Sequence, residues 1–298
     1  MATRHKICCV VTQPDKKKGR GLHLEQTAIK TKALELGLKV YQPPGINMTD
    51  AIDFLKKFEP DLFVVVAYGQ ILSKEILSIP KIFSLNAHAS LLPRYRGAAP
   101  INWAIINGDN QTGVSIIKMN EAMDAGPIIL EKNIEIAPAD TSLTLEDKMA
   151  SLAAELLAEV IKSIENKNYK LTTQDENNVS FAPKLKKENG VIDWNKPAAD
   201  IHNLVRGVLP WPGAFTYYKG KLLKIYKAQV SGSPDHQIGE SPGQVIQVSK
   251  EGIIVATGNG NLIIKELQIE GKRRMTVEEF ISGYKISLGD RLGYPAPF

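Results

Sequence analysis

A continuous apolar run at residues 62–67 constrains the fold of this 298-residue chain more than any other feature. The run has the length of a strand and carries no polar residue on either face, which is typical of a parallel strand covered by helices on both sides. Helix-like and strand-like segments alternate around it, at residues 5–12, 27–36, 40–42, 50–58, 73–77, 82–88, 99–107, 113–118, 127–136 and 143–164. This alternation predicts an α/β fold with an open, doubly wound and mostly parallel sheet.

The pattern changes after residue 183, where a basic link leads into one helix at residues 197–206. Five short strands separated by glycine-bearing turns are then expected, at residues 215–218, 222–228, 243–248, 252–256 and 261–268. Five such strands predict a small barrel of the OB type. We therefore expect two domains, residues 1–183 and 184–298, and the length and the hydrophobic fraction of 43% allow a substantial core.

The net charge of +5 is distributed unevenly along the chain. Residues 1–183 hold 21 basic and 21 acidic side chains, whereas residues 184–298 hold 16 basic and 11 acidic ones. The excess of positive charge in the second domain suits a polyanionic partner such as a nucleic acid. No apolar segment reaches membrane-spanning length and no signal-peptide core is recognisable, so we expect a cytoplasmic protein.

Two polar side chains, Asn86 and His88, lie two residues apart at the end of the strand expected at residues 82–88. Side chains with this spacing point to the same face of a strand. The carboxyl end of such a strand is where open α/β sheets bind ligands. An amide and an imidazole there can stabilise an oxyanion that develops on a carbonyl. Asp124, in a turn that ends at Gly126, is a candidate to orient the histidine or to accept a proton.

The motif Asn86-x-His88-x-Ser-Leu-Leu-Pro, followed by Arg-Gly-Ala-Ala-Pro100, resembles the folate-dependent formyltransferases, and in particular those that act on methionyl-tRNA. Other stretches agree in order and spacing, at residues 11–15, 19–21, 65–69, 123–126 and 210–213. The resemblance therefore covers nearly the whole chain. It implies an enzyme that transfers the formyl group of 10-formyltetrahydrofolate, its donor substrate, to the α-amine of methionyl-tRNA.

The resemblance also implies roles for particular residues, with Asn86, His88 and Asp124 as the catalytic set. Folate contacts are expected from two short segments, Ser90, Leu91, Leu92 and Pro93 in one and Tyr68 and Gly69 in the other. For Tyr68 itself, packing and folate contact are equally supported. Contacts to tRNA are expected from basic residues in both domains, Lys18, Arg20, Arg206, Lys272 and Arg273, although plain solubility is an alternative for each residue of the second domain. The histidines lack metal-ligand spacing, so no metal is expected, and we expect a monomer.

Two alternatives remain open at this stage. An enzyme with the same chemistry could formylate an amino sugar or hydrolyse formyl-folate. The family also normally begins with a further strand and helix that open on a Gly-Thr-Pro turn, whereas this chain starts close to the second strand. The expected consequence is a gap in the sheet with exposed strand edges. Either the true start lies upstream of Met1, or the chain is an inactive, truncated folate- or RNA-binding protein.

Overall fold

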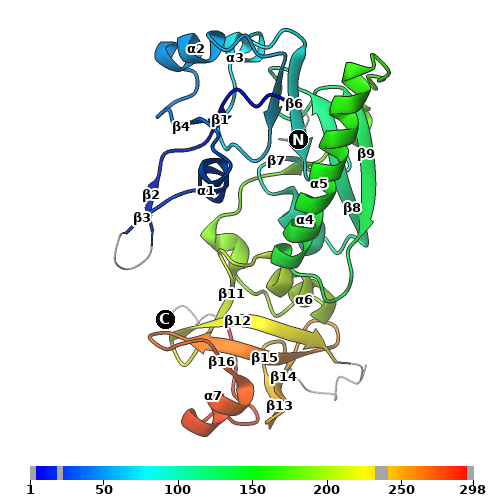
Figure 1. Ribbon diagram of the computed structural model, residues 1–298. Coiled ribbons are helices and arrows are strands. Elements are labelled where there is room, and N and C mark those ends of the chain that lie inside the picture. Colours follow the sequence, from blue (N-terminus) through cyan, green and yellow to red (C-terminus); the bar gives the residue numbers. More distant parts are fainter. Residues whose placement is uncertain (1–4, 19–22, 232–240, 294–298) are drawn as a thin grey trace. The chain divides into compact units, whose positions relative to one another are not determined.

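The computed structural model describes residues 5–18, 23–231 and 241–293, which form two compact units (Figure 1). The first unit combines residues 1–96, 113–132 and 151–180, and the second combines residues 97–112, 133–150 and 181–298. The chain therefore crosses between the units several times.

The main sheet of the first unit has four strands in the order β5 (Leu62–Val65), β6 (Phe83–His88), β8 (Gln111–Lys118) and β9 (Ile128–Glu135). β5 and β6 are parallel, whereas β6 and β8 are antiparallel. The sheet is thus mixed, and the expectation of a mostly parallel sheet holds only for its first part. Both the α/β class and the position of the apolar run in a strand agree with the sequence analysis.

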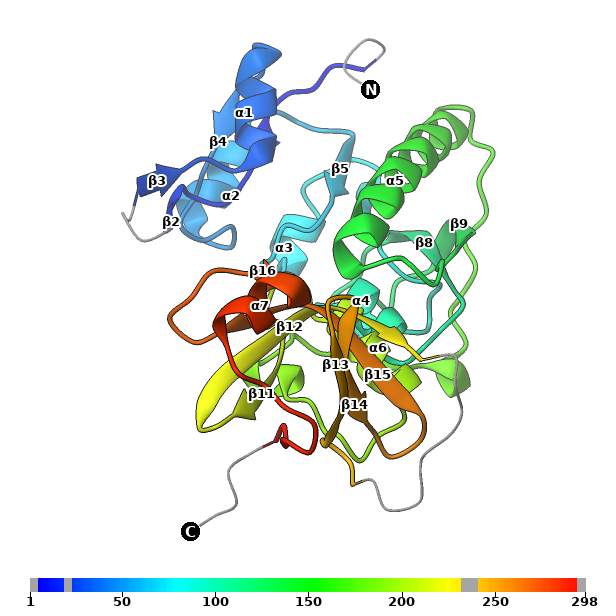
Figure 2. The same ribbon diagram turned by 90° about the horizontal axis from the view of Figure 1, so that it is seen from below.

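The strands of the first unit do not form one continuous sheet. β1 (Val10–Val11) and β4 (Val40–Tyr41) form a separate parallel pair (Figure 2 shows β4 and β5 as separate strands). Among the described residues, β5 has a strand partner only on its β6 side. Its apolar run is correspondingly open to solvent, with Val64 41% and Val66 52% exposed. The strand expected at residues 5–12 shrinks to two residues because β4 offers only two partners.

Helices α1 (Ala28–Glu35), α2 (Thr49–Lys56), α3 (Lys74–Leu77) and the later turns of α5 (Ser142–Glu165) complete the first unit with the short 3-10 helix η1 (Glu176–Asn178). Side chains of Thr27 and Ser73 cap α1 and α3 by accepting a backbone N–H. Helix α2 begins after Met48 and has no side-chain cap bond. Buried side chains of α2, α3 and adjoining loops form one core cluster, Ile46, Ile52, Leu55, Leu72 and Ile76.

The basic segment at residues 16–18 forms one strand of a small antiparallel hairpin. β2 (Lys16–Lys18) pairs with β3 (His23–Glu25). The segment lacks the apolar alternation of a half-buried strand, so the sequence pattern did not indicate it. Its base is fixed by Asp15, whose carboxylate accepts hydrogen bonds from Lys30 Nζ at 2.6 Å and from Gln42 Nε2 at 2.8 Å. These two bonds lower the pKa of Asp15.

The second unit is built on an antiparallel sheet in the order β11 (Ala214–Tyr218), β12 (Lys221–Val230), β15 (Asn261–Ile269), β14 (Gly252–Ala256) and β13 (Val245–Ser249). The short β16 (Met275–Thr276) pairs with β15. All five expected strands are present within a few residues of their expected bounds. In the described part of the chain, no pairing closes β13 onto β11, so the sheet order is that of an open sheet.

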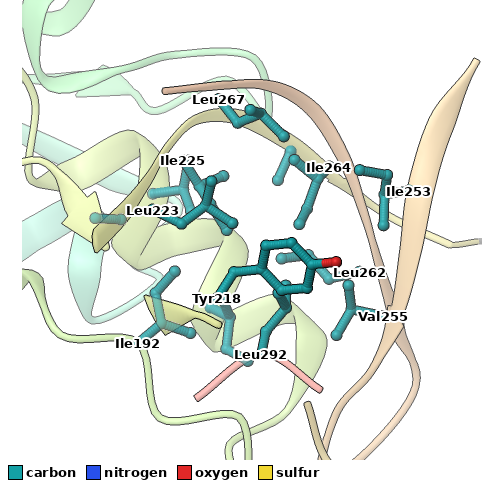
Figure 3. Packing of buried hydrophobic residues seen from close by; sticks show 14 of the residues in the cluster. Ile192, Tyr218, Leu223, Ile225, Ile253, Val255, Leu262, Ile264, Leu267 and Leu292 are labelled. Atoms are coloured by element: carbon teal, nitrogen blue, oxygen red, sulfur yellow. The ribbon is translucent and has the colours of Figure 1, made fainter. Parts of the chain in front are cut away.

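One face of this sheet supplies the core of the second unit, where side chains of β11, β12, β14 and β15 point toward one another (Figure 3). Leu223, Ile225 and Leu262 are completely or almost completely buried there. Burial of each such side chain stabilises the fold by about 1.5–3 kcal/mol. The remaining elements of the unit are α4 (Pro100–Ile106), η2 (Lys187–Gly190), α6 (Ala198–Gly207) and α7 (Val277–Gly283), and β7 (Arg96–Gly97) pairs with β10 (Phe181–Ala182).

Candidate active site

Strand β6 places Asn86 and His88 on one face, as their spacing predicts. Asn86 lies opposite Val65 on β5 and Ile117 on β8, and His88 lies opposite Ser115 on β8. Both residues are therefore held by strand pairing near the end of β6 and not by a flexible loop.

Asp124 meets both side chains, so the structure brings the three expected catalytic residues together. Asn86 Nδ2 donates to Asp124 Oδ1 at 3.2 Å. His88 Nδ1 lies 3.6 Å from Asp124 Oδ2, and the two side chains are only 6% and 16% exposed. At this distance the imidazole and the carboxylate form an ion pair when the ring is protonated.

A backbone carbonyl decides which ring nitrogen of His88 carries the permanent proton. His88 Nε2 lies 2.9 Å from the carbonyl oxygen of Tyr95. A carbonyl can only accept, so Nε2 carries hydrogen in either charge state of the ring. Nδ1 is then the nitrogen that gains or loses a proton, and it is the nitrogen that faces Asp124. His88 can therefore exchange a proton with a reacting group through Nδ1.

The turn that carries Asp124 has an unusual backbone and close packing. Asp124 has φ of +51°, a left-handed conformation that Asp tolerates better than most residues. Two residues on, a Cβ at Gly126 would lie 1.9 Å from the carbonyl oxygen of Lys118, so only glycine fits. The backbone of the turn thus lies directly against β8. This close packing requires the glycine that follows Asp124 in the motif.

Gln174 holds the same turn and was missed by the sequence analysis. Its Nε2 donates to the carbonyl oxygens of Asp124 at 2.8 Å and of Gly126 at 2.7 Å. Its Oε1 accepts from Arg96 Nε at 3.0 Å and from Arg96 Nη2 at 2.8 Å. Gln174 and Arg96 are each 5% exposed. No local signal marks Gln174, because it lies 50 residues beyond Asp124 in a segment without helical or strand periodicity.

The loop that contains Ser90, Leu91, Leu92 and Pro93 is fixed to β8 through Ser115. Ser115 Oγ donates to the carbonyl oxygen of Ser90 at 2.8 Å and accepts the backbone N–H of Leu92 at 3.1 Å. Ser90 Oγ donates to the carbonyl oxygen of Arg94 at 2.6 Å. The expected folate loop therefore has a defined backbone that begins two residues after His88. Ser115 is a second residue of this region that the sequence analysis missed.

Tyr68 and Gly69 lie just beyond the end of β5, where a side-chain hydrogen bond connects this segment to the residues that follow β1. Gln13 Nε2 donates to the carbonyl oxygen of Tyr68 at 2.7 Å. A Cβ at Gly69 would lie 2.6 Å from that same nitrogen, and Gly69 has φ of +79°. The Tyr68 ring packs against the cluster around Ile52, and its hydroxyl is buried without a hydrogen-bond partner among the described residues. Burial raises the pKa of Tyr68.

The expected tRNA contacts are distributed over both units. Arg20 lies outside the described residues. Lys18 belongs to β2. In the second unit, Arg206 Nη1 donates to the carbonyl oxygen of Asp140 at 2.9 Å. Arg273 forms an ion pair with Glu279, and the carbonyl oxygen of Lys272 accepts a hydrogen bond from Gln268.

Among the described residues, no helix has the length and apolar character needed to cross a bilayer. The same residues contain no cluster of three or more His, Cys, Asp or Glu side chains arranged to bind a metal ion.

Comparison with solved structures shows the fold. The chain resembles HypX from Aquifex aeolicus in complex with tetrahydrofolic acid, with 18% identity, a TM-score of 0.63, and coverage of 96% of this chain and 50% of HypX. It therefore spans about half the length of HypX. It also resembles an N-formyltransferase from Helicobacter canadensis in complex with folinic acid and dTDP-3-aminofucose. Here the identity is 19%, the TM-score is 0.62, and coverage is 87% of this chain and 99% of that chain.

Comparison at the sequence level is closer. The chain is 44% identical to the methionyl-tRNA formyltransferase of Acetivibrio thermocellus, over 97% of this chain and 93% of the relative. It is also 44% identical to that of Caldanaerobacter subterraneus, over 95% of this chain and 91% of the relative. A formyl transferase family model matches residues 2–161, and a model of the formyl transferase C-terminal domain matches residues 184–285. The chain belongs to the methionyl-tRNA formyltransferase family.

Proposed function

We propose that the chain transfers the formyl group of 10-formyltetrahydrofolate to the α-amine of methionyl-tRNA. The observation that carries the proposal is the buried cluster of one amide, one imidazole and one carboxylate formed by Asn86, His88 and Asp124. These three groups supply two hydrogen-bond donors and one proton acceptor at one place. Transfer of a formyl group between two nitrogens needs these elements and no covalent intermediate on the protein.

The roles of the three residues follow from their hydrogen bonds. Asn86 Nδ2 uses one hydrogen on Asp124, so its second hydrogen is left to donate to the oxyanion formed when the amine attacks the formyl carbon. Protonated His88 donates to the same oxyanion through Nδ1. The Asp124 carboxylate, beside the His88 ring, helps to move the proton of the attacking amine to the departing folate nitrogen.

Binding of the donor is assigned to the loop after β6. We propose that Ser90, Leu91, Leu92 and Pro93, together with Tyr68 and Gly69, contact the folate. Support comes from the fixed backbone of the loop, which Ser115 holds to the strand beside the catalytic pair.

Binding of tRNA is assigned to basic residues of both units, Lys18, Arg20, Arg206, Lys272 and Arg273. The concentration of positive charge after residue 183 supports this assignment. We also propose that residues 1–183 and 184–298 act as catalytic and tRNA-binding domains. We further propose that the second domain has an OB-like architecture, and that the protein works as a cytoplasmic monomer.

Formylation by the purified chain tests the proposal directly. With 10-formyltetrahydrofolate and methionyl-tRNA we expect turnover, and Asn86→Ala, His88→Ala or Asp124→Ala should each lower kcat about 10²–10³-fold. His5→Ala and Asn177→Ala change the same residue types on the surface of the first unit and should leave turnover unchanged. Turnover that survives all three site substitutions would refute the catalytic assignment.

Salt dependence separates tRNA from a small acceptor. A tRNA substrate binds through its phosphates and releases counterions, so its KM should rise steeply between 50 and 200 mM salt, by about 10-fold or more for a few phosphate contacts. An amino-sugar acceptor or water would give a nearly flat dependence. The same assay therefore discriminates between the proposed acceptor and the alternative ones.

A further inference from the structure

The turn that presents Asp124 is held by side-chain contacts from a distant segment. The Lys118 N–H donates to the Pro127 carbonyl at 3.0 Å at the base of the turn, and nearer Asp124 the Ala125 N–H makes a long bond of 3.4 Å to the Ala122 carbonyl. The carbonyls of Asp124 and Gly126 are both taken by the amide of Gln174. The position of the carboxylate is thus set largely from outside its own turn.

Both polar atoms of the Gln174 amide make two hydrogen bonds. Both hydrogens of Nε2 go to the two carbonyls, and Oε1 accepts two hydrogen bonds from Arg96. Arg96 has only donors, so the amide cannot flip without placing its NH₂ group against the guanidinium. The guanidinium is itself fixed by Glu176, at 2.8 Å and 3.2 Å. Glu176, Arg96 and Gln174 therefore form a hydrogen-bonded chain that ends on the backbone of Asp124, in which Arg96 and Gln174 are buried and Glu176 is exposed.

We propose that Gln174 is a positioning residue for formyl transfer, which sets the backbone of Asp124 and through it the carboxylate that contacts Asn86 and His88. This inference rests on the proposed function, because it acts through Asp124. The left-handed backbone of Asp124 makes such support necessary, since this conformation is less favourable for Asp than for glycine. Arg96 acts one step further out by fixing the orientation of the Gln174 amide.

A matched pair of substitutions tests the inference. Gln174→Glu keeps the shape and the bonds from Arg96 but puts a carboxylate oxygen, in place of the NH₂ group, against two carbonyls. Glu176→Gln makes the reverse change in the same network and leaves both carbonyl contacts intact. We expect Gln174→Glu to lower kcat about 10–100-fold with both KM values within about twofold, whereas Glu176→Gln should stay within about threefold of wild type.

A double-mutant cycle with Asp124→Ala shows whether Gln174 acts through Asp124. If it does, Gln174→Glu should lower kcat by less than about threefold in the Asp124→Ala background. Unchanged kcat in Gln174→Glu, or losses that multiply in the double variant, would overturn the inference. A wild-type rate in Asp124→Ala alone would refute the proposed catalytic assignment instead. If Gln174→Glu does not fold, Gln174→Asn, which retracts the amide by one methylene, serves in the same cycle.

Discussion

At the residue scale, Asp140 shows how one carboxylate can organise the start of a helix. Its two oxygens accept hydrogen bonds from the backbone of Ala137 at 2.8 Å, from Thr144 Oγ1 at 3.1 Å and from Lys148 Nζ at 2.7 Å. Burial alone would raise the pKa of Asp140, but these partners outweigh it and lower the pKa. The backbone carbonyl oxygen of Asp140 accepts a hydrogen bond from Arg206, so Asp140 also contacts α6.

We expect Asp140→Asn to lower the free energy of unfolding by about 1–3 kcal/mol at pH 7, because the bond from the charged Lys148 is lost. A carboxyl whose pKa is lowered on folding stabilises the protein above its unfolded pKa of about 3.9 and stops doing so as pH falls through the folded value. The difference from wild type should therefore shrink below about pH 4. Urea unfolding between pH 3 and 7 measures it, with the exposed Glu159→Gln on the same helix as a control. A difference that does not depend on pH would contradict the assignment.

The catalytic residues differ in how far sequence reasoning could reach them. Asn86 and His88 were predictable because the two-residue period of a strand puts both on one face. Asp124 was a candidate from its glycine-bounded turn. Gln174 could not be found in this way, because its contact with the turn arises from a chain reversal over 50 residues and carries no periodic or compositional signal. The position of a supporting amide depends on tertiary structure and not on local pattern.

At the element scale, the approach of α4 and α6 depends on a single glycine at the end of α6. A Cβ at Gly207 would lie 2.7 Å from a side-chain carbon of Ile106 and 3.2 Å from the Ile106 backbone nitrogen. Asn102 Nδ2 also donates to the Gly207 carbonyl oxygen at 2.7 Å. The backbone of α6 thus lies directly against α4 at this point.

We expect Gly207→Ala to destabilise the protein by about 1–3 kcal/mol, because the added methyl overpacks the α4–α6 contact. Gly283→Ala is a matched control, since Gly283 also ends a helix, α7, and a Cβ there would have nothing within 4 Å. This control should be neutral or stabilising by up to about 1 kcal/mol, because alanine reduces the entropy of the unfolded chain. Thermal unfolding of both variants measures the difference. Equal effects would mean that the two helices do not approach as closely as described.

Strand boundaries show where pattern reasoning stops at the element scale. Helix α1 begins and ends within one residue of expectation because its spacing and its cap agree. The first strand is far shorter than expected, because a strand needs a partner and Val40–Tyr41 supplies only two residues. The sequence of residues 62–67 predicts a strand covered on both faces, yet Val64 and Val66 are exposed. A run of apolar residues indicates a preference for burial. The actual exposure of each side chain depends on which strands and helices lie beside it.

This exposure gives a further prediction for β5. Val64→Thr should change the free energy of unfolding by less than about 0.5 kcal/mol, as for other surface positions. Leu85→Ala on the neighbouring β6, where the side chain is fully buried, should cost about 2–5 kcal/mol. Denaturant unfolding of the two variants makes the comparison. A cost above about 2 kcal/mol for Val64→Thr would show that this edge of the sheet is covered in solution.

At the scale of the whole molecule, the uneven charge matters only where a basic side chain remains available to phosphates. Arg273 is paired with Glu279, and Arg274 is paired with Glu266. Within the described residues, the ammonium of the adjacent Lys272 has no carboxylate partner. The total charge of residues 184–298 therefore overstates how many of its cations can release counterions on binding tRNA.

The last prediction compares two neighbouring cations that carry the same charge in different surroundings. Lys272→Met should weaken methionyl-tRNA binding and reduce the slope of log Kd against log salt by about 1, as expected for one lost phosphate contact. Arg273→Met should change the slope less, because Glu279 already neutralises much of that charge in the free protein. Affinity measured at several salt concentrations, with both variants in parallel, makes the comparison. Equal slopes for wild type and Lys272→Met would place the phosphate contacts elsewhere on the chain.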